Sequence, residues 1–175
     1  MEEIEILIIG DVDLEMVERA VKKMENLLKI KARIDFCKEN PDYAYNKGRG
    51  QYISGEIIKR INSERDSQKV LGIVDLDLCT PVLTYVFGEA QLDGKAGVVS
   101  LYRLREGSYG EPEIVFERFY KELLHELGHL FGLTHCSLKN CVMNFSANVK
   151  QIDLKGEQFC EACLDKLKSK LRERK

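Results

Sequence analysis

Three histidines lie within eleven residues of this 175-residue chain, and the sequence contains no others. His125 and His129 are four residues apart, so on a helix both imidazoles project from one face, one turn apart. Glu126 would lie about 100° around that helix from His125 and about 60° from His129, close enough to reach a water on a shared metal ion. Two histidines and a glutamate in this arrangement are the minimal apparatus of a zinc hydrolase.

His135 completes the candidate site only if the chain turns sharply. On a continued helix it would lie about 9 Å beyond His129 along the axis and about 120° off the shared face. Gly132 occurs where the turn is needed, and glycine adopts left-handed backbone conformations without strain. We therefore expect Gly132 to allow His135 to act as the third ligand.

The cysteines indicate a second metal site. Four of the six lie in the last quarter of the chain, at Cys136, Cys141, Cys160 and Cys163. Two pairs of thiols at short spacing suffice for a tetrahedral Zn²⁺ site. A redox pair or buried free thiols are the alternatives, but the presence of two matched pairs favours a metal. Because Cys136 follows His135 directly, this structural zinc would also fix the third histidine.

The motif resembles a known family. The run His125–His135 reads H-E-L-G-H-L-F-G-L-T-H, and with the following Met143 it is similar to the metzincin metallopeptidases. Cys136 directly after the third histidine, followed by Cys141, Met143 and a Cys-x-x-Cys pair, resembles the archaemetzincins in particular. The resemblance implies a metzincin-like catalytic domain, a zinc-dependent peptidase activity, a Met-turn beneath the catalytic zinc and a second, structural zinc.

The first half of the chain alternates strand and helix patterns, which favours a mixed, mainly parallel sheet in the α/β (α+β) class. The expected strands are Glu5–Ile9, Lys31–Phe36 and Val70–Leu78. The expected helices are Leu14–Leu28 and Tyr52–Ile61, with a loop over Glu39–Gly50 before the second. Two further strands, Leu83–Leu92 and Ala96–Leu104, are joined by the turn signal Asp93-Gly94. This hairpin predicts an antiparallel strand at the sheet edge.

The apolar spacing from Phe116 onward predicts a long helix that starts near Glu113 and stops at Gly132. An irregular stretch follows, and Cys160–Arg174 is expected to form a closing helix. We expect one domain over residues 1–175. Its sheet-and-helix half covers 1–131, and residues 132–175 hold the Met-turn, the cysteine site and the last helix.

Composition excludes several other classes. A chain of 44% hydrophobic residues can bury a core, and it has no apolar run of the length that spans a membrane. Its acidic start does not resemble a secretory signal, so we expect a cytoplasmic protein whose thiols stay reduced. A net charge of −2 gives no general attraction for nucleic acid, which is not an expected partner. A monomer is the favoured assembly.

The leading hypothesis is zinc-dependent hydrolysis of peptide bonds, with two Zn²⁺ ions per chain and Glu126 as general base. A peptide or protein substrate would lie along the edge strand near Thr84–Ala90 by strand addition. Short peptides or chain ends are the favoured substrates. One alternative is a catalytically silent, zinc-stabilised module that binds protein or nucleic acid, through a basic tail at Lys166–Lys175. Another is a zinc hydrolase that acts on a different amide.

Overall fold

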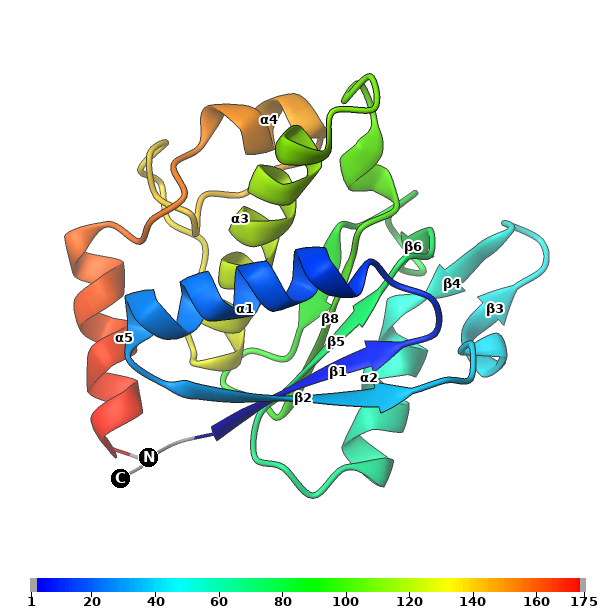
Figure 1. The fold of residues 1–175 in the computed structure, drawn as a ribbon, viewed down its shortest axis with the longest axis horizontal. Helices are drawn as coiled ribbons and strands as arrows, with labels where there is room; N and C mark the ends of the chain where they lie inside the picture. The colour runs from blue at the N-terminus through cyan, green and yellow to red at the C-terminus, as the bar shows by residue number, and fades with distance from the viewer. Residues whose placement is uncertain (1–2, 174–175) are drawn as a thin grey trace.

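Five strands form the central sheet of the structure, a computed structural model that describes residues 3–173. In spatial order they are β2 (Lys31–Cys37), β1 (Glu3–Ile9), β5 (Val70–Val74), β8 (Ala96–Ser100) and β7 (Gly88–Ala90). The first four are parallel, and β7 runs antiparallel to β8 at the edge. The predicted mixed sheet with an antiparallel edge strand is confirmed. Figure 1 shows its parallel strands β2, β1, β5 and β8 side by side.

Helices cover both faces of this sheet (Figure 1). The helices are α1 (Leu14–Leu28), α2 (Ser54–Glu64), α3 (Pro112–Leu130), α4 (Val149–Leu154) and α5 (Glu161–Glu173). Alternate residues of a strand point to opposite faces. Accordingly, Ile6 and Ile8 of β1 pack in the core cluster shared with α1, α3 and α5, whereas Leu7 and Ile9 pack in the cluster shared with α2. The sheet is therefore buried on both sides.

The predicted strand Val70–Leu78 is divided between two sheets. Strand β5 covers only its first five residues. After a turn, the chain enters a second sheet that consists of β3 (Tyr45–Asn46), β4 (Gln51–Ile53) and β6 (Leu78–Cys79). In the turn, Asp75 and Asp77 form ion pairs with Arg105 and Arg103 at 2.5 and 2.7 Å. Charged residues in these ion pairs thus follow β5 directly, where the predicted strand would have continued.

The predicted hairpin forms, but its strands are shorter than expected. Asp93 adopts a left-handed conformation with φ 51° at the turn. Of the segment Leu83–Leu92, only β7 pairs with β8, which ends at Ser100. Val86 instead pairs with Leu78 of the second sheet. The residues before β7 therefore leave the central sheet and run beside it.

The predicted long helix is confirmed as α3, and the chain turns directly after it. Gly132 has φ 84°, a left-handed conformation. The closing helix α5 covers all but the ends of the predicted range Cys160–Arg174, and Arg174 lies outside the described residues. None of the helices formed by residues 3–173 is both long enough and apolar enough to cross a membrane.

Candidate metal centres and active-site cleft

The three histidines converge on one point. His125 and His129 project from α3, and the turn at Gly132 carries the chain back toward them. One ring nitrogen from each of His125, His129 and His135 lies within 4.8 Å of the others. The ring centroids are 4.6 to 5.2 Å apart. The turn that the sequence required at Gly132 therefore brings His135 to the other two.

Backbone carbonyls orient the two helical imidazoles. The Nδ1 of His125 lies 2.8 Å from the Val142 carbonyl, and the Nδ1 of His129 lies 2.7 Å from the Leu133 carbonyl. Because a carbonyl only accepts, each Nδ1 carries the proton and each Nε2 presents a lone pair. The two Nε2 atoms are 3.1 Å apart. Facing lone pairs at this distance repel each other unless a cation lies beside both, so the donor set fits a metal ion.

Burial also favours the neutral, ligating form of these rings. It lowers the pKa of His125 to about 4 and lowers the pKa of His129 and His135 as well. Each imidazole is therefore uncharged at neutral pH. A neutral imidazole is the form that binds zinc.

Glu126 is buried beside the histidines and has an unsatisfied oxygen. Its Oε2 is buried and makes no hydrogen bond to a described residue. Burial, reinforced by the carboxylate of Glu122, raises the pKa of Glu126 well above its ordinary value. A cation bound beside it would favour the ionised form. Gly88 of β7 packs against this side chain, since a Cβ on Gly88 would lie only 2.8 Å from the Glu126 Cγ.

A cleft of about 410 Å³ opens over the histidines and Glu126. One rim is formed by the segment 80–90, which includes β7, and the other by residues 145–147. The predicted substrate-binding segment Thr84–Ala90 thus lines the cleft, although only Gly88–Ala90 of it is a regular strand. Strand β7 is the last strand of its sheet, so its outer backbone groups are available for pairing.

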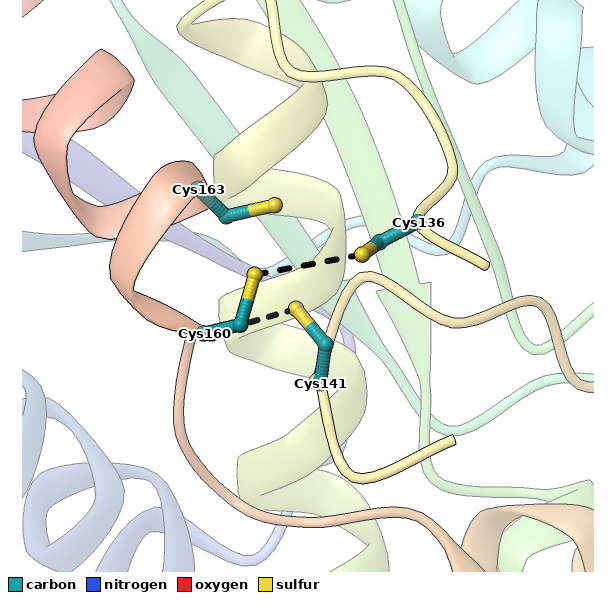
Figure 2. Close-up of side chains that lie close together, drawn as sticks. All are labelled: Cys136, Cys141, Cys160 and Cys163. Atoms are coloured by element: carbon teal, nitrogen blue, oxygen red, sulfur yellow. Dashed lines mark hydrogen bonds between the residues drawn. The ribbon is translucent and has the colours of Figure 1, made fainter. Parts of the chain in front are cut away.

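The four predicted cysteines form a second cluster, and their sulfur atoms all lie within 4.8 Å of one another. Figure 2 shows the side chains of Cys136 and Cys141 pointing from the loops after α3 toward those of Cys160 and Cys163 at the start of α5. The Sγ atoms of Cys136 and Cys160 are 3.9 Å apart, and the Cys160 amide donates to the Cys141 Sγ at 3.3 Å. All four thiols are free of disulfides. Four convergent thiols fit a structural zinc ion.

The segment between the two clusters passes beneath the histidines. Met143 is fully buried, and its carbonyl accepts a hydrogen bond from the Cys136 amide at 2.9 Å. Its sulfur lies under Gly128 of α3, where a Cβ would come within 2.4 Å of it. Met143 thus packs against the turn of helix that carries both His125 and His129.

This contact predicts that Gly128→Ala destabilises the protein. The new methyl group would displace Met143, and overpacking of a buried site typically costs about 1–3 kcal/mol. Denaturant unfolding of the zinc-loaded protein measures this loss. Gly55→Ala in α2 is the matched control, because a Cβ there meets nothing within 4 Å. Equal free energies of unfolding for the two variants would contradict the predicted contact.

Sequence reasoning missed a buried ion pair next to the site. Lys155, which follows α4, lies with its Nζ 2.8 Å from the Oε1 of Glu122. Their side chains are only 1% and 5% exposed. Glu122 lies on α3 one turn before Glu126. A charged residue on the apolar face of a predicted helix could have indicated a buried ion pair. Lys155 gave no signal, since its partner is distant in the sequence.

Comparison with known proteins identifies the class. The model of Peptidase family M54 matches residues 1–169. The archaemetzincin of Methanocaldococcus jannaschii is 40% identical over 168 residues, which is 93% of this chain and 90% of the relative. That of Methanopyrus kandleri is 41% identical over 133 residues, 75% of this chain and 74% of the relative.

Comparison with solved structures finds relatives of the same family. The crystal structure of the Methanopyrus kandleri archaemetzincin superimposes with a TM-score of 0.87 at 34% identity, over 98% of this chain and 96% of that one. That of the Archaeoglobus fulgidus archaemetzincin, complexed with malonate, has a TM-score of 0.82 at 32% identity, over 94% and 99%.

The fold and the two clusters therefore define a zinc metallopeptidase. The chain belongs to peptidase family M54, the archaemetzincins. The predicted family, fold class and enzyme class are confirmed, and the histidine and cysteine groups fit the two predicted zinc ions. Family membership favours the peptidase over the silent binding module and over a hydrolase of other amides.

Proposed function

We propose that His125, His129 and His135 hold the catalytic zinc and that Glu126 is the general base of peptide hydrolysis. The observation that carries this proposal is the convergence of three imidazole nitrogens beside a buried carboxylate oxygen that has no partner among residues 3–173. Zinc in such a site supplies Lewis-acid chemistry, because it polarises the scissile carbonyl and lowers the pKa of a water toward about 7.

The residues of the chain perform the proton transfers. Glu126 accepts the proton of the attacking water and delivers it to the amine of the leaving group. Its burial between α3 and Gly88 keeps its carboxylate in one place during both transfers. The carbonyls of Val142 and Leu133 hold the imidazoles of His125 and His129 with their Nε2 atoms close together, where they would bind the zinc ion.

The substrate is a peptide or protein, as the family implies, and we propose that it binds in an extended conformation along β7. The outer edge of β7 faces the cleft, so a substrate chain can add to the sheet as a further strand. Short peptides and chain ends fit a cleft of this size better than a folded protein does.

We propose that Cys136, Cys141, Cys160 and Cys163 hold the structural zinc. This ion would tie the start of α5 to the loop that carries His135 and Met143, and so fix the third ligand and the Met-turn together. Gly132 supports the same geometry by its left-handed conformation.

We further propose that residues 1–175 act as one catalytic domain, as a monomer in the cytoplasm. One core cluster contains residues of β1, α1, α3 and α5, so the halves 1–131 and 132–175 share a core. All seven proposed ligands belong to one chain. Six free cysteines, four of them in a cluster that needs reduced thiols, suit a reducing compartment.

Zinc content tests the two sites together. We expect two zinc ions per chain, of which mild chelation removes one readily, because three imidazoles leave a solvent-accessible position. His135→Ala should reduce the easily removed ion, and Cys163→Ser should release the retained ion and destabilise the fold. Cys37→Ser is the control thiol, since Cys37 lies on β2 outside the cluster. A single zinc that is indifferent to His135→Ala would contradict the histidine site.

A further inference from the structure

The two rims of the active-site cleft are joined at one point. The Tyr85 hydroxyl donates a hydrogen bond to the Ala147 carbonyl at 2.8 Å. Tyr85 belongs to the rim that leads into β7, and Ala147 belongs to the opposite rim. Both residues line the same cleft. The hydrogen bond is therefore a bridge across the substrate channel.

The Tyr85 ring is held firmly in this position. It packs edge-on against Phe87 at 5.5 Å, and the guanidinium of Arg103 lies over its face at 4.6 Å. Arg103 is held in turn by Asp77, which accepts two hydrogen bonds of 2.7 Å. This chain of contacts runs from the turn after β5 to the cleft and orients the hydroxyl.

The backbone of the same rim is fixed from behind. Arg49 donates hydrogen bonds to the carbonyls of Thr80, Leu83 and Thr84 at 2.6, 2.7 and 2.8 Å. Gln51 donates a further bond to the Thr84 carbonyl at 2.8 Å. The loop before Tyr85 is thus anchored by Gln51 of β4 and by Arg49 of the turn that precedes β4.

The opposite rim is anchored as well. The Ala147 amide donates to the Gln151 side chain at 2.6 Å, and Asn148 caps the start of α4 through a 3.1 Å bond to the Gln151 amide. Ala147 is therefore fixed next to the N-terminal end of α4. Both partners of the bridge are set in place before any substrate binds.

The bridge lies close to the reacting centre. Tyr85 precedes Gly88, which contacts Glu126, by three residues. Ala147 lies two residues after Phe145, whose ring centroid is 5.2 Å from that of His135. An extended chain advances about 3.3 Å per residue, so at most about 10 Å of channel separates the site from the bridge. That distance accommodates about three substrate residues.

We propose that Tyr85 determines substrate length, by closing the cleft at one end about three residues from the scissile bond. This inference rests on the proposed function. A peptide that ends before the bridge fits the cleft as it stands. A peptide that extends further on that side must break the hydrogen bond between Tyr85 and Ala147, whereas extension on the other side carries no such cost.

Two series of peptides with one common scissile sequence test the proposal, one extended stepwise at the N-terminal side and the other at the C-terminal side. We expect kcat/KM of the zinc-loaded enzyme to fall beyond about three residues in one series only. Tyr85→Phe keeps the ring and removes the donor. It should raise the long-to-short ratio of kcat/KM in that series by about threefold to tenfold, the equivalent of one hydrogen bond.

Tyr45→Phe is the matched control, because Tyr45 is exposed on β3 and does not line the cleft. It should leave the ratio as in the wild type. Tyr85→Ala, which also removes the ring, should raise the ratio further. Equal tolerance of both extensions in the wild type, or an unchanged ratio in both Tyr85 variants, would overturn the proposal.

A binding measurement separates this proposal from the proposed function. The same peptides, labelled with a fluorophore, are titrated into the Glu126→Gln variant with and without Tyr85→Phe, and anisotropy reports their affinity. In one outcome, the wild type cleaves none of the peptides while binding still shows a one-sided length limit that Tyr85→Phe relieves. This result would support the bridge and refute the peptidase mechanism. Cleavage without a length limit would support the peptidase mechanism and refute the bridge. Peptides that neither bind nor are cleaved would overturn both.

Discussion

Glu126→Gln should reduce kcat/KM for peptide hydrolysis by about 100- to 10,000-fold, the range that general acid–base catalysis contributes. The amide keeps the size of the side chain and so preserves its packing between α3 and Gly88. It cannot accept the proton of the attacking water or deliver one to the leaving amine. The loss should therefore fall mainly on kcat, as expected when an interaction of the transition state is removed.

Glu117→Gln is the matched control for this experiment. Glu117 lies on the same helix but is exposed to solvent, so this change should leave both activity and zinc content as in the wild type. Zinc content should also remain at two per chain in Glu126→Gln, because the proposed ligands are intact. Full activity in Glu126→Gln with normal zinc content would rule out its role as the general base.

Lys155→Met should lower the free energy of unfolding by about 3–5 kcal/mol, the usual cost of leaving one partner of a buried ion pair without the other. The Glu122 carboxylate would remain inside the protein, on the same helix as Glu126, without its ion-pair partner. Lys155 also donates to the Asn144 carbonyl at 3.3 Å, directly after Met143. Its loss should therefore loosen the Met-turn as well as α3.

Denaturant unfolding of the zinc-loaded protein measures this effect, with Lys150→Met as control. Lys150 lies on α4 and is exposed, so its replacement should change stability by less than about 0.5 kcal/mol. The double variant Glu122→Met/Lys155→Met should recover most of the lost stability, because two apolar side chains remove the unpaired charge. Additive losses in the double variant would contradict a coupled pair.

The sequence by itself determined the chemistry of this protein. Helical periodicity depends on local spacing, so the pattern before His125 was sufficient to predict α3 and to place His129 on the same face. Gly132 was identifiable because a left-handed turn has a strong residue preference. The four clustered cysteines were identifiable because few side chains bind zinc, and their pairing in sequence is close.

Tertiary structure decided what surrounds these ligands. Strands β5 and β7 are shorter than predicted, and the nearby residues Asp77 and Val86 pair with residues of other elements. The local sequence pattern does not show such pairings, so it predicted both strands too long. The Glu122–Lys155 ion pair and the Tyr85–Ala147 bridge join residues 33 and 62 positions apart. Contacts of this separation have no local signature in a single sequence, because the fold alone brings the partners together. The convergence of the proposed ligands could thus be predicted from spacing, whereas the shape of the cleft required the structure.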